Sequence, residues 1–80
     1  MDIAVVVRSF IVENFYVGDP DALEDRTSLF DHGIIDSTGV LEVIAFLEKE
    51  MAIDVKDAEM IPDNLDSIER IAAFVARKKG

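Results

Sequence analysis

Serine, histidine and carboxylate side chains could do chemistry in this chain, and one short segment brings all three together. Asp36 and Ser37 are adjacent, and His32, the only histidine, lies just before them. Many serine hydrolases place the nucleophile in Gly-x-Ser-x-Gly, whereas residues 35–39 are Ile-Asp-Ser-Thr-Gly. A chain of 80 residues also has little room for a substrate pocket around such a trio. We therefore predict no catalytic residue and expect His32 to be a solvated loop residue.

The spacing of the acidic residues and the absence of cysteine argue against a dedicated metal site. No segment has the Asp-x-Asp-x-Asp-Gly start and the closing glutamate of an EF-hand calcium loop. The chain has no cysteine, so it has no thiolate ligand, thiol nucleophile or disulfide. One acidic run is expected to be a solvated face that attracts divalent ions only weakly, and its members are Asp54, Asp57, Glu59 and Asp63.

Length, hydropathy and charge limit the class of protein. Eighty residues allow one domain, residues 1–80, and a hydrophobic fraction of 50% is enough to form its core. The 17 acidic and 8 basic side chains give a net charge of −9, which repels nucleic-acid phosphates and anionic lipid headgroups. We therefore expect no nucleic-acid partner, and instead protein partners with basic surfaces.

The sequence contains no stretch typical of a membrane span or a targeting segment. The longest apolar run near the start, residues 3–7, follows Asp2 and ends at Arg8. It is too short to span a bilayer, and no basic segment precedes it as in a signal peptide. We expect no membrane insertion and a cytoplasmic location.

Apolar residues recur with helical spacing in the first half of the chain. A stripe over residues 3–15, with Asp2 as a capping residue, predicts the first amphipathic helix, although three consecutive valines within it favour a strand by propensity. A second helix is predicted over residues 37–50, with Asp36 as its cap. Its apolar stripe is the clearest in the chain and consists of Val40, Val43, Ile44, Leu47 and Met51.

The second half of the chain predicts one short and one long helix. A short helix or turn is expected around residues 56–60, and it should stop before Pro62 because the residue before a proline disfavours helical geometry. The last helix is expected to open with a capping box formed by Asp66 and Glu69. It should end in the basic residues 77–79, which suit the negative end of the helix dipole.

A long loop separates the first two helices. It runs from Gly18 to Asp36, and a loop of this length in a small domain is usually functional. Its apolar side chains should hold it on the core, and they are Leu23, Leu29, Phe30, Ile34 and Ile35. The predicted fold is therefore all-α: a small four-helix bundle of three main helices plus a short third helix, with this loop between helices 1 and 2.

On spacing alone, Ser37 is an ordinary first-turn helix residue, but the surrounding sequence resembles a known family. Residues 29–39, Leu-Phe-Asp-His-Gly-Ile-Ile-Asp-Ser-Thr-Gly, resemble the attachment site of acyl carrier proteins, where an Asp-Ser pair opens the second helix. The chain length, the acidity and the order of helices match as well. Residues 61–68, Ile-Pro-Asp-Asn-Leu-Asp-Ser-Ile, resemble a segment of stand-alone carriers that work with adenylate-forming ligases, including D-alanyl and other aminoacyl carriers.

The resemblance implies that Ser37 carries 4′-phosphopantetheine through a phosphodiester. A phosphopantetheinyl transferase would attach the group from coenzyme A with magnesium, and Asp36 would help the transferase to position the serine. The prosthetic thiol would hold an acyl or aminoacyl group as a thioester, which a chain without cysteine cannot do alone. The protein would then be a substrate handed between enzymes, and not itself an enzyme.

The same resemblance predicts a partner-binding face on the second helix. By the resemblance this face comprises Thr38, Leu41, Glu42 and Ala45, and we add Glu48 as a further acidic residue on the outer side of the helix. All five lie off the apolar stripe, so they are available to partners. Two residues depart from the pattern of fatty-acid synthesis carriers: Thr38 stands where leucine or methionine is usual, and Lys49 adds a positive charge to a face that is often acidic.

The implied partners are enzymes that load, move and use the carried group. We expect a phosphopantetheinyl transferase, an acyl- or aminoacyl-adenylating ligase and downstream acyl or condensing enzymes, with the chain acting as a monomer in a dedicated pathway. An alternative within the family is a general fatty-acid or polyketide synthesis carrier. An alternative from another class is a small acidic helical adaptor without a prosthetic group. The sequence does not name the cargo.

Overall fold

Residues 2–80 fold into four α-helices and two short 3-10 turns. The computed structural model describes residues 2–80. The helices are α1 (Ile3–Asn14), α2 (Ser37–Glu50), α3 (Pro62–Leu65) and α4 (Ile68–Lys79), and the 3-10 turns are η1 (Pro20–Ala22) and η2 (Asp57–Glu59). Residues 2–80 contain no strand, which confirms the all-α fold class. No helix in this described part of the chain is long and apolar enough to cross a membrane.

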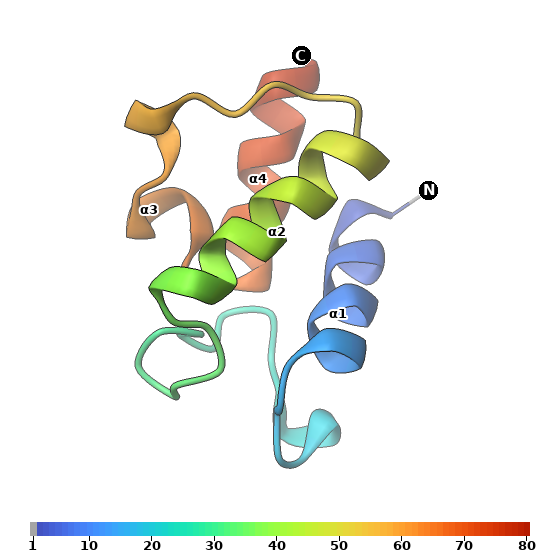
Figure 1. Cartoon of the computed structure of the whole chain (residues 1–80). Coiled ribbons are helices and arrows are strands. Elements are labelled where there is room, and N and C mark those ends of the chain that lie inside the picture. The colour runs from blue at the N-terminus through green and yellow to red at the C-terminus, as the bar shows by residue number, and fades with distance from the viewer. Residues whose placement is uncertain (1) are drawn as a thin grey trace.

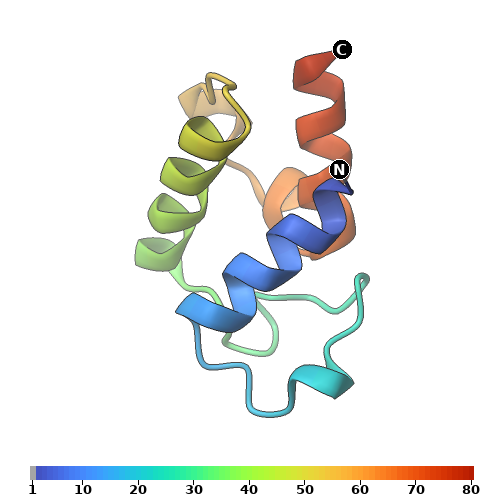
Figure 2. The same ribbon diagram turned by 90° about the vertical axis from the view of Figure 1, so that its right-hand side faces the viewer.

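The three long helices pack around one cluster of buried apolar side chains. In Figure 1, α2 crosses in front of α4, and Figure 2 shows α1 passing diagonally in front, with α2 and α4 on either side. The predicted stripe of α2 is buried except for Val40, which is half-buried. The buried cluster comprises Val7, Ile11, Leu23, Leu29, Ile35, Val43, Ile44, Leu47, Met51, Val55, Leu65, Ile68, Ile71, Phe74 and Val75.

The long loop is held on this core by its apolar residues, as predicted. Leu23, Leu29 and Ile35 are buried, and Phe30 and Ile34 pack against the cluster while half-buried. In both ribbon views the loop lies at the end of the bundle where α1 finishes and α2 begins (Figures 1 and 2). The loop is therefore packed as part of the fold, and this packing fixes where α2 begins.

Carboxylate side chains cap α1 and α2, also as predicted. The Asp2 carboxylate accepts a hydrogen bond from the Ala4 amide at 3.0 Å. The Asp36 carboxylate accepts one from the Gly39 amide at 2.7 Å. Each bond satisfies an amide that has no partner inside its helix. Because the cap stands at Asp36, α2 begins at the next residue.

The predicted cap of α4 is wrong. Ser67, not Asp66, is the N-cap, and its hydroxyl accepts a hydrogen bond from the Arg70 amide at 3.1 Å. Within residues 2–80 the Glu69 carboxylate forms no capping box; the Glu69 amide donates instead to the Asp25 carbonyl at 2.9 Å. Asp66 lies one residue too early to cap α4, and its carboxylate bonds the long loop.

The turn predicted around residues 56–60 is present as η2, and it ends before Pro62. The short third helix of the bundle is α3, which begins at Pro62 and so lies later than the prediction placed it. Proline suits the first position of a helix because the amide it lacks would have no intrahelical partner there. The residue before it, Ile61, is extended with φ −122° and ψ 154°, as expected before a proline. The proline therefore keeps Ile61 extended, which ends the preceding turn, and then begins the helix α3 itself.

Glu59 ties the connection between α2 and α3 to the last helix. Its carboxylate accepts from the Lys56 amide at 3.0 Å and pairs with the Lys78 ammonium at 2.9 Å. The Lys56 amide, followed by Lys78, holds the pKa of the Glu59 carboxyl below its ordinary value. This carboxylate therefore stabilises the fold above its ordinary pKa, and that contribution is lost as the pH falls through the lowered pKa.

The end of α2 is backbone-strained at one residue. Met51 closes the helix in right-handed geometry, and Ala52 follows it with φ 55°. A left-handed residue after a helix is most often glycine, since a Cβ there meets the neighbouring carbonyl. An alanine at this position therefore costs free energy in the folded state.

Replacing Ala52 with glycine should stabilise the protein. Relief of the left-handed strain exceeds the entropy lost by glycine, so Ala52→Gly should raise the free energy of unfolding by about 0.5–1 kcal/mol. The matched control is Ala73→Gly, an exposed position within α4, which should lower it by about 1 kcal/mol. Urea denaturation of both variants checks the pair. Destabilisation by both would show that Ala52 carries no such strain.

Candidate functional site

Ser37 is the first residue of α2, and its side chain is exposed. Asp36 directs its carboxylate to the Gly39 amide, and its carbonyl accepts from the Val40 amide at 3.0 Å. Within residues 2–80 the Ser37 hydroxyl makes no hydrogen bond, either to the Asp36 carboxylate or to any other group. The hydroxyl is presented to solvent by a helix end whose geometry the neighbouring aspartate fixes.

The long loop that leads to Ser37 is fastened to the start of α4 by Asp66. The Asp66 carboxylate accepts hydrogen bonds from the Ser28 hydroxyl at 2.8 and 2.9 Å and from the Phe30 amide at 3.0 Å. The Asp66 carbonyl accepts from the Leu29 amide at 2.6 Å. Two parts of the chain that are 36 to 38 residues apart are therefore joined through one residue.

Leu29 connects this anchor to Ile34 and Ile35, the residues shortly before Ser37. Its side chain is fully buried, and its carbonyl accepts from the Ile34 amide at 2.9 Å and the Ile35 amide at 3.3 Å. Ile35 is itself buried, and Asp36 follows it directly. The backbone thus closes on itself between Leu29 and Ile35, and this closed segment sets where α2 begins.

Close packing at Gly39 joins the start of α2 to the end of α1. A Cβ atom at Gly39 would lie 2.9 Å from the Phe15 Cε1 atom, and 3.4 Å from both the Asp36 carboxylate and the Ile35 side chain. The Phe15 ring packs edge-on against Phe10 with ring centres 6.0 Å apart, so it has little freedom to move away. Glycine is therefore required at this position by contact, not by backbone conformation.

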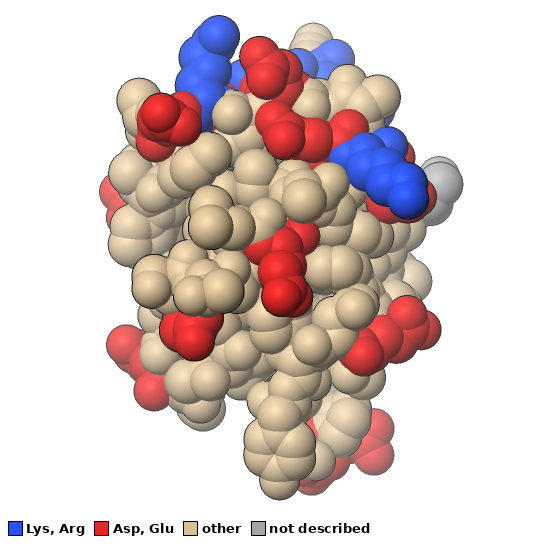
Figure 3. All heavy atoms as spheres, viewed as in Figure 1, with Lys and Arg blue, Asp and Glu red and all other residues tan. Residues whose placement is uncertain are grey.

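The five residues of the predicted partner-binding face are all exposed on α2. Thr38, Ala45 and Glu42 are free of the core, and Leu41 is 60% exposed, a large value for leucine. Glu48 is exposed too, but its carboxylate accepts from the Val55 amide at 3.0 Å and holds the segment after α2. In Figure 3, viewed from the α2 side, scattered carboxylates interrupt a mostly uncharged surface.

His32 has a local contact and no connection to Ser37. Its Nδ1 atom lies 3.0 Å from the Ser28 carbonyl, and the residue is exposed in the loop. No hydrogen bond joins the His32 ring to Ser37 or Asp36 within residues 2–80. Nor does the described chain hold any group of three or more His, Asp or Glu side chains that could bind a metal ion.

Comparison with known proteins identifies the family. The family model described as the phosphopantetheine attachment site matches residues 6–75. The chain belongs to the acyl carrier protein family. It is also 30% identical, over 69 residues, to the "Probable acyl carrier protein PigG" of a Serratia species, a match that covers 86% of this chain and 79% of that protein.

The prosthetic group of this carrier family is 4′-phosphopantetheine, and the start of α2 fits its phosphodiester. The first amides of a helix have no intrahelical acceptor, and the helix dipole places partial positive charge at that end. Both favour an anion at the exposed serine that begins this 14-residue helix. The Asp36 carboxylate already occupies the Gly39 amide, so the amides of Ser37 and Thr38 are the ones left for the phosphate.

The segment that resembles ligase-paired carriers has a folding role in this chain. Pro62 starts α3, Leu65 is buried, and Ser67 caps α4. The Asn64 side chain donates to the Glu59 carbonyl at 2.9 Å and accepts from Arg77 at 2.8 Å. Residues 61–68 therefore form the junction of α3 and α4. The side chains of Asn64, Leu65 and Ser67 make contacts within the fold.

A methyl group at Gly39 should destabilise the protein because of the Phe15 ring. We expect Gly39→Ala to lower the free energy of unfolding by about 1–3 kcal/mol, since overpacking outweighs the better helix propensity of alanine. In a Phe15→Ala background the same change should become neutral or stabilising. Thermal unfolding of the four proteins checks the reversal, and an equal loss in both backgrounds would refute the proposed contact.

Removing the Asp66 carboxylate should loosen the approach to Ser37. Asp66→Ala leaves the Phe30 amide and the Ser28 hydroxyl without their acceptor, so we expect a loss of about 2–3 kcal/mol of stability and faster amide exchange at residues 29–35. Asp63→Ala is the control, because that exposed carboxylate makes no hydrogen bond within residues 2–80. Equal effects of the two substitutions on stability and exchange would contradict the anchoring role of Asp66.

Proposed function

We propose that Ser37 carries 4′-phosphopantetheine and that the protein holds acyl or aminoacyl groups as thioesters between enzymes. The observation that carries the proposal is the exposed Ser37 hydroxyl at the start of α2, with Asp36 as the cap. This position lies inside the family match over residues 6–75. The bound group would supply the thiol that a cysteine-free chain lacks.

The residues around Ser37 position the serine, and the chemistry belongs to partner enzymes. No base is hydrogen-bonded to the Ser37 hydroxyl within residues 2–80, so its activation falls to a phosphopantetheinyl transferase using coenzyme A and magnesium. Asp36 holds the first turn of α2 and presents the serine to that enzyme. The protein then acts as a carried substrate and not as a catalyst.

The partner-binding face of α2 is the proposed contact surface for these enzymes. Leu41 offers an exposed apolar side chain, and Glu42 places a carboxylate beside it. An apolar contact rimmed by charge is typical of transient protein interfaces. Basic surfaces on the transferase, the ligase and the downstream enzymes would complement the net charge of −9.

We further propose a dedicated pathway served by an acyl- or aminoacyl-adenylating ligase. Support comes from residues 61–68 and from Thr38 and Lys49, which depart from the fatty-acid carrier pattern. A general fatty-acid or polyketide synthesis carrier is the second candidate, and the exposed α2 face suits it equally. The adaptor without a prosthetic group is set aside, because the chain belongs to a family that carries one.

Three further expectations stay predictions. They are that residues 1–80 act as one carrier domain, that the chain is a monomer, and that it works in the cytoplasm. The small size and the negative charge favour a monomer, since like-charged copies repel one another.

Ser37→Ala should abolish pantetheinylation without unfolding the protein. Alanine is a good helix former and the cap is Asp36, so the stability change should be about 1 kcal/mol or less. Intact mass after incubation with a transferase and coenzyme A measures the loading, and Ser9→Ala, at an exposed position of α1, provides a matched control. Loading of the Ser37 variant would place the attachment site elsewhere.

Glu42→Lys should slow loading by weakening association with basic enzymes. The residue is exposed, so the melting temperature should change little. Raising the salt concentration should slow the wild-type protein more than the variant, because exposed charges are screened beyond about 8 Å at physiological ionic strength. Glu13→Lys makes the same charge change on α1. Equal loss of loading rate in both variants would show that only net charge matters.

A further inference from the structure

Three arginines gather around one hollow on the face formed by α3, α4 and the long loop. The hollow has a volume of about 480 Å³, and the arginines that line it are Arg26, Arg70 and Arg77. They are three of only eight basic residues in a chain of net charge −9. None of the lining residues belongs to α2, so this surface differs from the proposed partner-binding face.

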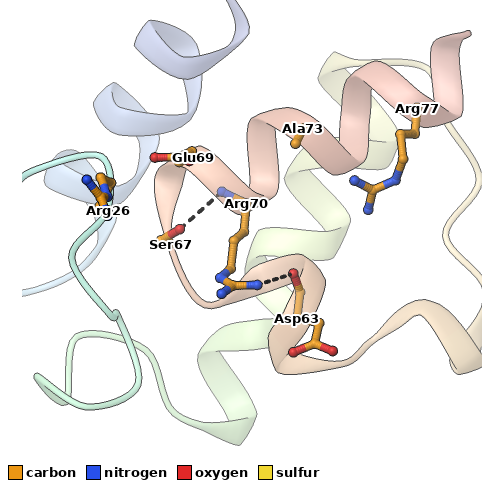
Figure 4. A pocket seen from close by; sticks show the side chains of 7 residues that line it. All are labelled: Arg26, Asp63, Ser67, Glu69, Arg70, Ala73 and Arg77. Carbon is orange, nitrogen blue, oxygen red and sulfur yellow. Dashed lines mark hydrogen bonds between the residues drawn. The ribbon is translucent and has the colours of Figure 1, made fainter.

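The three guanidinium groups come from two segments, α4 and the long loop, and share one side of the molecule. Figure 4 shows Arg70 and Arg77 projecting from the same side of α4 above α3, with Arg26 in the loop beside the start of α4. Arg70 and Arg77 are two helical turns apart, about 10 Å along the axis. The small side chain of Ala73 lies between them and leaves the space open.

None of these arginines is neutralised by an ion pair. The ion pairs within residues 2–80 are Arg8–Asp25 and Lys78–Glu59. Arg70 donates to the Asp63 carbonyl at 3.2 Å, and Arg77 donates to the Asn64 side chain at 2.8 Å. Each of these contacts uses one donor of a group that has five. Arg26 makes no side-chain hydrogen bond in the described chain.

Two acidic residues at the rim reduce the charge of the hollow without cancelling it. Glu69 points toward Arg26, and the Asp63 carboxylate lies below Arg70, yet neither forms an ion pair with an arginine (Figure 4). Three arginines against two carboxylates leave one net positive charge on the lining. The guanidinium forks therefore keep donors available for carboxylates from outside.

We propose that this arginine surface binds an acidic segment of a partner protein, at a site separate from α2. The spread of about 10 Å between Arg70 and Arg77 suits several carboxylates along a peptide better than one small anion. An extended nucleic acid or an anionic membrane would also meet the acidic remainder of the surface and be repelled. A second copy is disfavoured as the occupant because two chains of charge −9 repel each other.

Such a surface would let the carrier stay bound while Ser37 remains accessible. The arginines are exposed, and two of them lie on α4, whose inner face is the core. Complementary charge would add selectivity and fast association to a contact that need not be tight. The proposal goes beyond the prosthetic-group chemistry and does not depend on Ser37.

A hexaglutamate peptide tests the proposal on the full chain. Titrating it into ¹⁵N-labelled protein at physiological ionic strength should produce saturable amide shifts at Arg26 and residues 69–77, and none at residues 37–48. Arg26→Gln combined with Arg77→Gln should raise the apparent Kd about tenfold. Arg26→Gln alone should weaken binding measurably, and it removes no intramolecular side-chain hydrogen bond, so folding is not at risk.

The matched control removes two positive charges elsewhere, in the variant Lys49→Gln combined with Lys56→Gln. It should bind hexaglutamate within about twofold of wild type, because screening confines the attraction to nearby charges. Equal weakening by both double variants would overturn the proposal. Saturable shifts with inorganic phosphate but not with hexaglutamate would indicate a small-anion pocket and also overturn it. Concentration-dependent self-association that the arginine substitutions abolish would identify a second copy as the occupant instead.

Discussion

The hydrogen bonds between Asp66 and the long loop are the constraint on which the rest of the site depends. A loop between two helices would otherwise leave the start of α2 free to shift. Asp66 holds Ser28, Leu29 and Phe30 through its carboxylate and carbonyl. Leu29 then closes the backbone onto Ile35. Because Ile35 is buried in the core, the positions of Asp36 and Ser37 are set by the residues before them. Ser37 therefore needs no side-chain hydrogen bond to be held in place.

The side chains that hold the loop in place are different from the side chains that stay exposed near Ser37. The groups that anchor the loop are half-buried or buried, whereas Ser37 and the proposed partner-binding face of α2 are exposed. A reactive hydroxyl engaged in holding the fold would have to be released before modification. Here Asp36 caps the helix, Gly39 allows α1 to approach, and the proposed attachment serine is left exposed.

Much of the fold follows from local patterns in the sequence. The bounds of α2 are predicted correctly because Asp36 and a five-residue apolar stripe both define them. The turn at residues 56–60 is predicted too, but the cap of α4 and the helix α3 are not, because Asp66 has a partner 38 residues away and Pro62 can start a helix as well as end one. Contacts between distant segments, including the Phe15 ring above Gly39 and the grouping of Arg26 with α4, leave no local signal in the sequence.

The most direct test of the account is the position of the prosthetic group on the loaded protein. Trypsin should release residues 27–49 as one peptide, which contains Ser37 together with the competing hydroxyls of Thr27, Ser28 and Thr38. Fragmentation of this peptide by tandem mass spectrometry locates the added phosphopantetheine. We predict that the modification lies on Ser37 alone. Modification at Ser28 or Thr38, or on a peptide that contains Ser9 or Ser67, would contradict it.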